Sequence, residues 1–380
     1  MLLCQCASSS VFFCNKFDQV AGLMTIERLD IQHLRNISQS RLEFGEQFNL
    51  IIGINASGKT SLLEAIYLLG TGRSFRTSRL QHIIQAEKEQ FTVSAQLRSE
   101  GGALITAGMA LNRKGRILRV DGKNARSSAQ LAELLPLQLI NQQSFNLIDE
   151  GPPHRRKFLD WGVFHVEHGF FAVWQRYTRA LKQRNAALKS GVQDIRSWEK
   201  EMSEAAIHLH EMRKNYIEAL KPILEQSIRD MLEINDISLD YRPGWDTELS
   251  LADILAGEID QDRRQGFTRH GPQRADLVFK RSGVAAKERL SRGQQKLLVS
   301  ALVLGQARLL ATKQARRSTV LIDDITAELD SVHCGRLMAA LAETGAQLVV
   351  TAINSESVPI VENVDTRMFH VEHGIVKTVV

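Results

Sequence analysis

The segment GINASGKT, residues 53–60, matches the spacing G-x-x-x-x-G-K-[ST]. Glycines at these positions let backbone N–H groups curl around phosphate oxygens, and a helix that follows turns its positive end towards the anion. Lys59 is expected to reach the β- and γ-phosphates, and Thr60 to supply an oxygen to Mg²⁺. The segment therefore predicts an ATP-binding loop, with the adjoining serine included: Gly53, Ile54, Asn55, Ala56, Ser57, Gly58, Lys59, Thr60 and Ser61.

Two adjacent carboxylates, Asp323 and Asp324, end the apolar run 320–322. A buried strand that ends in two acids is costly unless a cation lies beside them. In a nucleotide-binding protein the first acid is expected to hold Mg²⁺, directly or through water, together with Thr60. The second acid would lie beside the γ-phosphate and orient or deprotonate water, so Asp324 is predicted to be catalytic. Solvated acids at a turn are the alternative, which the phosphate loop makes the weaker one.

A sheet must position these motifs. The run 48–52, FNLII, is continuously apolar, as in a strand covered on both faces, and it leads directly into the phosphate loop. The stretch that follows has helical spacing, and we expect this helix to stop at Gly70. Alternating strands are expected over 91–121, and further strands over the apolar runs near 137–140, 319–323 and 346–353. The predicted fold class is α/β.

The middle of the chain has a different character. Pro152 and Pro153 suit the start of a helix, and two or three long amphipathic helices are expected from there to about residue 234. A turn and a strand are expected over 241–250. We therefore predict a helical domain inserted into an α/β head, with the divisions 24–145 for the first part of the head, 146–265 for the insertion and 266–380 for the last part of the head.

The bulk composition is that of a water-soluble protein, with 43% hydrophobic and 24% charged residues among 380. No apolar run is long enough to cross a bilayer, and the net charge of +5 favours a polyanionic partner, although a solvated basic surface is the alternative. Three of the four cysteines lie in the first fourteen residues, so no disulfide framework is expected. Residues 1–23 lack the pattern of a signal peptide. We expect a disordered extension or a start at Met24, and a cytoplasmic location.

A second motif, LSRGQQK at 290–296, suits a helix N-terminus with Ser291 as N-cap and Gln294 completing a capping box. It also resembles the signature L-S-x-G-Q of ABC-type ATPases. That resemblance implies an ATP-dependent homodimer, in which Ser291, Gly293 and Gln294 contact ATP held by the other subunit. It further implies a D-loop over 326–330.

The same resemblance assigns four more positions. Gln142 or Gln143 would be the Q-loop glutamine, a metal and catalytic residue that we place at Gln142. Arg35 would lie near the nucleotide base. Thr351 stands where transporter ATPases have a switch histidine, and Asp324 stands where most ABC ATPases have glutamate. Because aspartate is shorter by one methylene, we expect slow hydrolysis, with ATP acting as a timer.

The interval between Lys59 and Ser291 is far longer than in a transporter ATPase subunit, and the insertion is far shorter than the helices of SMC proteins. This combination resembles the RecF family of bacterial recombination and gap-repair proteins, as do GRSFRT (72–77), GPPHRRKFLDW (151–161), KQRNAALK (182–189) and TRHGPQRADL (268–277). The fold would then be an ABC-type P-loop ATPase head with an inserted helical arm domain. Ala56 and Gln273 depart from residues that are frequent in the family.

Membership of the RecF family would imply a slow, DNA-stimulated ATPase that dimerises on single- and double-stranded DNA and prefers gapped DNA. With RecR and RecO it would help load RecA onto single strands, in association with the nucleoid and not with a membrane. The alternatives are an SMC-like tether, a transporter ATPase subunit and a nuclease of the overcoming-lysogenisation type. Basic clusters suit contacts with the DNA backbone, and the candidates are Arg73, Arg76, Arg79, Arg155, Arg156 and Lys157.

Overall fold

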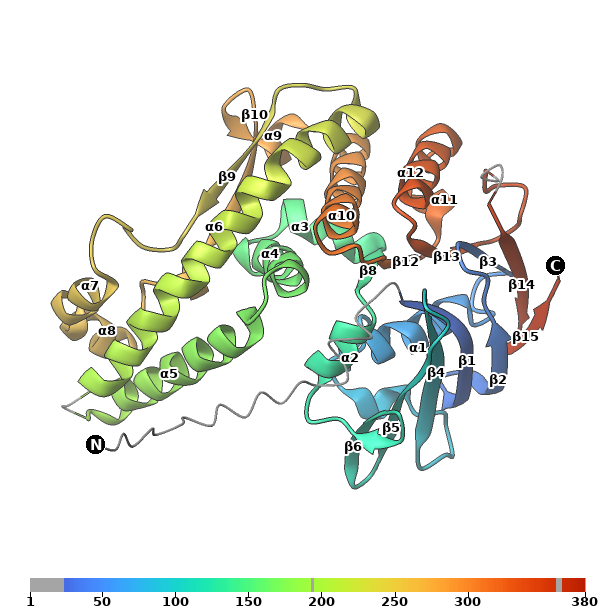
Figure 1. Cartoon of the computed structure of the whole chain (residues 1–380), viewed down its shortest axis with the longest axis horizontal. Coiled ribbons are helices and arrows are strands. Elements are labelled where there is room, and N and C mark those ends of the chain that lie inside the picture. The colour runs from blue at the N-terminus through green and yellow to red at the C-terminus, as the bar shows by residue number, and fades with distance from the viewer. Residues whose placement is uncertain (1–23, 193–194, 360–363, 380) are drawn as a thin grey trace, which may run out of the picture.

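Five parallel strands form the centre of the protein in the computed structural model, which describes residues 24–192, 195–359 and 364–379 (Figure 1). Residues 1–23, with their three cysteines, lie outside the described residues. The parallel strands, each hydrogen-bonded to the next, are β14 (Thr366–Glu372), β3 (Phe48–Ile52), β13 (Gln347–Ala352), β12 (Thr319–Ile322) and β8 (Leu137–Ile140), and β15 (Ile375–Thr378) adds an antiparallel edge. This confirms the α/β fold class.

Successive residues of the central strands point into two different cores, because side chains alternate across a sheet. In β12, Leu321 joins a cluster that includes helix α1 (Lys59–Thr71), whereas Val320 and Ile322 join the cluster around α10 (Arg292–Gln314). All three are fully buried. The strand is therefore covered on both faces, which accounts for its unbroken apolar run.

A second, antiparallel sheet covers the side of α1 that faces away from the parallel strands, and its buried residues complete the same core. Arg28–Gln32 of its strand β1 pair with β2 on one side and β4 on the other. The sheet order is β2 (Ile37–Glu43), β1 (Met24–Leu34), β4 (Phe91–Ser99), β5 (Leu104–Asn112), β6 (Gly115–Val120) and β7 (Lys123–Asn124).

Helix α1 does not stop at Gly70, as the sequence led us to expect. It continues to Thr71 and ends on Gly72, which has a left-handed φ of 66° and donates its N–H to the carbonyl of Leu68 at 2.8 Å. Gly70 serves a different purpose, since a Cβ there would lie 3.0 Å from a side-chain atom of Leu137. The small residue lets α1 approach the neighbouring strand.

Three helices extend from the head as an arm: α4 (Pro152–Val166), α5 (Phe170–Ser190) and α6 (Arg196–Leu232). Figure 1 shows α5 running along one side of α6. Helix α4 approaches α6 closely at Gly162, where a Cβ would lie 2.0 Å from the hydroxyl of Tyr216. The boundaries 24–145, 146–265 and 266–380 stay a prediction.

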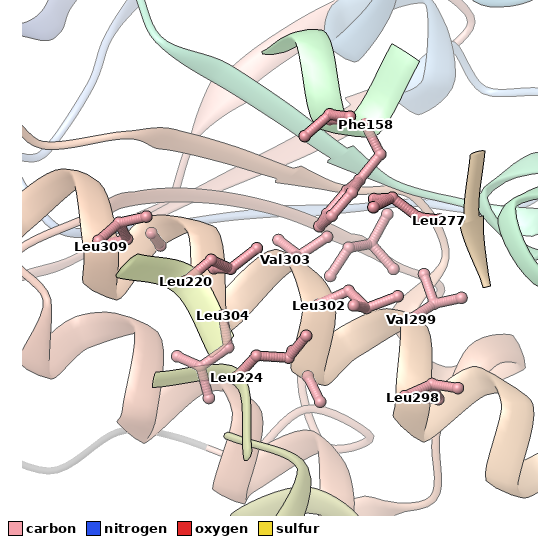
Figure 2. Packing of buried hydrophobic residues seen from close by; sticks show 14 of the residues in the cluster. Phe158, Leu220, Leu224, Leu277, Leu298, Val299, Leu302, Val303, Leu304 and Leu309 are labelled. Carbon is pink, nitrogen blue, oxygen red and sulfur yellow. The ribbon is translucent and has the colours of Figure 1, made fainter. Parts of the chain in front are cut away.

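The arm joins the head through an apolar seam between α6 and α10 (Figure 2). Leu220 and Leu224 of α6, Leu304 of α10, Phe158 of α4 and Leu277 of β10 (Asp276–Arg281) belong to this one cluster. This core connects the signature helix α10 to the arm, and Gln306 of α10 adds buried hydrogen bonds to the hydroxyl of Tyr216 and the carbonyl oxygen of Phe158.

A small third sheet, ordered β11-β10-β9, and several short elements complete the described structure. The strand expected within 241–250 lies mostly before that segment, at Ile237–Arg242, and the rest forms turns that lead to a helix. The remaining elements are η1 (Leu80–Ile83), α2 (Ser128–Leu134), η2 (Gln142–Phe145), α3 (Asn146–Asp149), β9 (Ile237–Arg242), α7 (Leu251–Gly257), α8 (Ile259–Gln265), η3 (Pro272–Arg274), β10 (Asp276–Arg281), β11 (Val284–Ala285), α9 (Ala286–Arg289), α11 (Ile325–Glu328) and α12 (Ser331–Glu343).

Among the described residues, none of the helices combines the length and the apolar character that crossing a bilayer would require.

Candidate nucleotide site

The motifs converge because they follow strands of one parallel sheet. Strands β3, β12, β13 and β8 all point the same way, so their carboxyl ends meet at one edge. The phosphate loop follows Ile52, the acid pair follows Ile322, and η2 follows Ile140. Ligands of open α/β sheets bind at this edge. A cavity of about 1720 Å³ lies there, and its lining includes the phosphate loop, Asp323 and Asp324.

The phosphate loop has the backbone of an anion-binding turn. Gly53 and Gly58 have φ of 157° and 126°, and a Cβ at Gly53 would lie 2.3 Å from the carbonyl oxygen of Val371. Ala56 also has a left-handed φ, 64°, which is strained for a residue with a Cβ. The loop therefore needs glycine at its two ends and tolerates alanine at a cost in its middle.

Lys59 closes the loop from inside. Its Nζ donates to the carbonyl oxygens of Gly53 at 2.6 Å and Ile54 at 3.0 Å. Burial lowers the pKa of this amine, and the nearby charges of Asp324 and Asp323 partly restore it. The ammonium is held by carbonyl groups at the floor of an anion site, from which it can turn to a phosphate.

Asp323 lies between two hydroxyl groups. Its Oδ1 accepts from Thr60 Oγ1 at 3.1 Å and from Thr351 Oγ1 at 2.9 Å. Burial raises the pKa of the Asp323 carboxyl, and these two hydrogen bonds lower it in part. Carboxylate and hydroxyl oxygens are the ligands that Mg²⁺ takes in nucleotide sites, so this donor set fits the ion. The described residues contain no cluster of three metal-binding side chains, and a nucleotide would have to complete the coordination.

Asp324 precedes helix α11 in a left-handed conformation, with φ 54° and ψ 58°. Its N–H donates to Thr351 Oγ1 at 2.8 Å, and its side chain is half-buried at the cavity wall. Thr351 itself is fully buried and does not line the cavity. The structure thus places Thr351 behind the acids, where it can position them but cannot touch a nucleotide.

The signature helix begins as expected. Ser291 Oγ accepts from the N–H of Gln294 at 3.3 Å, and Gln294 Oε1 accepts from the N–H of Ser291 at 3.1 Å. One turn later Lys296 donates to the carbonyl oxygen of Ala327 at 2.8 Å and lies 5.3 Å from the ring centre of Phe145. Lys296 therefore connects the signature helix, the D-loop and the segment that follows Gln142. It was not singled out in the sequence because a lysine on a helix has no distinctive spacing.

A buried carboxylate that the motifs did not reveal lies under the same cavity. Glu64 of α1 has no exposed side-chain surface and accepts two hydrogen bonds from Arg35, at 2.8 and 2.9 Å. It also accepts from Ser74 Oγ and lies 3.9 Å from Arg76. An acid in the first turns of the helix after a phosphate loop was the available signal. Glu64 holds two cavity-lining arginines that come from separate loops.

The predicted ligands divide into two groups. One group lines the cavity, as does Gln143: Arg35, Asn55, Ala56, Gly58, Lys59, Thr60, Ser61, Gln142, Gly293, Asp323 and Asp324. The other does not: Gly53, Ile54, Ser57, Ser291, Gln294 and Thr351. Gln142 and Gln143 are both exposed on η2, so the geometry leaves open which of them is the Q-loop residue.

The proposed DNA contacts also divide. The guanidinium of Arg155 donates two hydrogen bonds to the carboxylate of Asp276, at 2.7 and 3.0 Å. Arg156 donates to the carbonyl oxygen of Ala275 at 2.8 Å. These bonds fasten α4 to strand β10 and the residue before it, so these two arginines already have partners within the protein. Arg76 lies at the nucleotide cavity. Arg73, Arg79 and Lys157 are exposed and stay candidates for contacts with the DNA backbone.

Comparison with known proteins shows the family of this chain. The family described as RecF/RecN/SMC N terminal domain matches residues 25–377. The DNA replication and repair protein RecF of Pseudomonas paraeruginosa is 44% identical over 357 residues, covering 92% of this chain and 97% of the relative. RecF of Pseudomonas syringae pv. syringae is 43% identical with the same coverage.

Solved structures show the same fold. The recombination mediator protein RecF-ATPrS in the RecFOR pathway has a TM-score of 0.84 at 24% identity, covering 94% of this chain and 99% of that chain. Its RecF-ATP counterpart has a TM-score of 0.81 at 25% identity, covering 94% and 98%. The Smc head bound to the C-winged helix domain of ScpA has a TM-score of 0.59 at 16% identity. It covers 93% of this chain and 96% of that chain, and it shows likeness of fold alone. This chain belongs to the RecF family of DNA replication and repair proteins.

Proposed function

We propose that this protein is an ATP-dependent clamp on DNA, which dimerises when each head binds ATP. The observation that carries the proposal is the placement of the signature motif. Ser291 and Gly293 are exposed at the start of α10, and Ser291 does not line the cavity of its own chain. Ser291 is therefore free to contact ATP held by a second copy, and Gly293 lies beside it at the rim of its own cavity.

The residues at the nucleotide cavity have distinct roles in this proposal. Lys59 and the loop N–H groups bind the phosphates, Thr60 and Asp323 hold Mg²⁺, and Asp324 orients or deprotonates the attacking water. Bound Mg²⁺ would neutralise charge on the phosphate oxygens. The shorter side chain of Asp324 leaves its carboxylate farther from that water than a glutamate would, so hydrolysis is slow and limits the lifetime of the dimer.

The DNA substrate and the protein partners are inferred from the RecF relatives. The curated relatives are DNA replication and repair proteins, and the solved relative is named a recombination mediator of the RecFOR pathway. We extend this to gapped DNA as the substrate, DNA-stimulated hydrolysis, RecO and RecR as partners, RecA loading as the outcome and the nucleoid as the location. The alternatives of a transporter subunit and an SMC-like tether are set aside, because 92% of the chain aligns with RecF proteins.

The test measures binding of gapped, fully duplex and single-stranded DNA with ATP, with ADP and without nucleotide, over a range of salt concentrations. Backbone contacts release counterions, so affinity should fall steeply as salt rises. We expect ATP to tighten binding to gapped DNA most, and Lys59→Ala to abolish that gain. A DNA affinity that changes neither with salt concentration nor with the bound nucleotide would contradict the proposed clamp.

A further inference from the structure

A chain of aromatic rings crosses the junction between α4 and α5. Ring centres lie 4.8 Å apart for Phe164 and His165, 6.0 Å for Phe164 and Phe171, and 6.2 Å for Phe171 and Trp174. The Trp161 ring lies tilted against His165, with 4.5 Å between centres. The rings of Trp161, Phe164, Phe171 and Trp174 are only half-buried. Phe164 and Trp174 also pack against the arm core, which holds the row rigid.

Cations lie at both ends of this row. Lys157 is exposed on α4, four and seven residues before Trp161 and Phe164, and so on the same side of the helix. On α5, Lys182 follows Phe171 by eleven residues, three helical turns or about 16 Å along one side, and Arg179 lies beside it. Helix α5 contains five cations and no acidic residue.

The cations of α5 differ in whether they already have an acidic partner inside the protein. Arg184 of α5 is buried against Asp262 and Glu199, and Arg176 faces Glu201. By contrast, neither Arg179 nor Lys182 has an acidic partner among the described residues. They keep their charge available to an anion from outside.

We infer that this face of the arm, defined by Lys157, Trp161, Phe164, Phe171, Trp174, Arg179 and Lys182, binds single-stranded DNA. Phosphates would lie on the cations, and unpaired bases would stack on the half-exposed rings. Duplex DNA offers the phosphates but hides the faces of its bases, so the rings favour a single strand. An acidic protein would also match the charge, and a single strand adds planar bases that stack on the row of rings. The inference rests on the proposed DNA clamp, for which it supplies the contact to the unpaired part of a gap.

The experiment measures the affinity of the full chain for a fluorescent oligothymidylate and for a duplex of equal length. Two variants probe the face: Arg179→Ala with Lys182→Ala, and Phe171→Leu, which keeps an apolar side chain but loses the stacking surface. The control is Lys214→Ala with Lys221→Ala, which removes two exposed cations from α6. Thermal unfolding and ATP hydrolysis without DNA verify that each variant is folded and that its nucleotide site is intact.

We expect both face variants to bind oligothymidylate roughly tenfold more weakly, with the control within about twofold of the wild type. Phe171→Leu should leave duplex affinity unchanged, because the duplex does not use the ring. If the cation variant weakens both DNAs equally and Phe171→Leu affects neither, the face binds duplex backbone and the inference is wrong. Wild-type affinity in both variants would also overturn it and leave the clamp standing. A wild-type protein that binds no DNA would overturn both.

Discussion

The buried hydroxyl of Thr351 joins the two acids of the site. Its Oγ1 donates to Asp323 Oδ1 at 2.9 Å and accepts from the N–H of Asp324 at 2.8 Å. One side chain on β13 therefore positions the metal ligand and the backbone of the proposed base, both of which follow β12. The position that resembles a catalytic switch thus acts here through its neighbours.

Replacing Thr351 by valine tests this role, because valine keeps the shape and removes the hydroxyl. The N–H of Asp324 would lose its partner, so we expect a loss of about 1–3 kcal/mol in the free energy of unfolding. ATP hydrolysis should also fall, because both acids lose their support. Urea unfolding and steady-state hydrolysis measure the two effects, and Thr351→Ser should restore both. Wild-type hydrolysis in Thr351→Val would show that the acids need no such support.

Burial of Asp323 predicts a pH-dependent stability. Because burial raises the pKa of its carboxyl in the folded state, the unliganded fold is favoured when Asp323 is protonated. That contribution is complete below the unfolded pKa and is lost as pH rises through the folded one. At neutral pH the carboxylate therefore lowers stability, and Asp323→Asn should raise the free energy of unfolding of the unliganded protein.

Thermal unfolding at several pH values measures this difference, which should shrink as the pH falls towards the ordinary aspartate range. Mg²⁺ with ATP should then stabilise the wild type and not Asp323→Asn. A variant that is less stable at neutral pH without ligand would show that the hydrogen bonds of Asp323 outweigh its burial.

Glu64→Gln tests the buried carboxylate beneath the nucleotide. Arg35 would lose its charged partner, and since its side chain is 22% exposed, water offsets part of the loss. We expect about 2–3 kcal/mol less stability and several-fold weaker ATP binding, with kcat changed less than KM. The matched control is Glu233→Gln in the exposed pair with Arg336, where the expected loss is below about 1 kcal/mol. Equal losses in the two variants would contradict the role assigned to Glu64.

Ala56→Gly tests the strain in the phosphate loop. The left-handed conformation of a residue with a Cβ destabilises the folded state by roughly 1–2 kcal/mol. Glycine, in turn, stabilises the unfolded chain by about 0.4–1 kcal/mol through its greater conformational entropy. The variant should therefore be more stable by about 0.5–1 kcal/mol in urea unfolding, with ATP affinity retained. A destabilised variant would mean that contacts of the Ala56 methyl group outweigh the strain.

Many of the regular elements could be predicted because their signals are local. Apolar runs predicted the central strands β3, β8, β12 and β13, and the phosphate loop matched a specific motif, whereas β14 and β15 were not predicted. The end of α1 was misjudged because Gly70 is a close-packing residue that contacts Leu137, and only the tertiary fold reveals that use.

The polar contacts of the site were harder to predict for the same reason. Arg155 belongs to a basic cluster, but its partner Asp276 lies 121 residues away in the chain. Arg76 and Glu64 meet at the cavity through a loop whose path no motif specifies. The clusters of basic residues thus suggested DNA contacts, but the sequence did not show which of these residues are already paired inside the protein.

ATP-dependent dimerisation is the central claim, and the mass of Asp324→Asn in solution tests it most directly. This variant should bind ATP but hydrolyse it at least tenfold more slowly, because the amide cannot accept a proton from water. Light scattering after size exclusion should show a dimer with Mg²⁺ and ATP, and a monomer with ADP or without nucleotide. Ser291→Arg in the same background should stay monomeric with ATP. A dimer that forms regardless of nucleotide, or a monomer under every condition, would contradict the account.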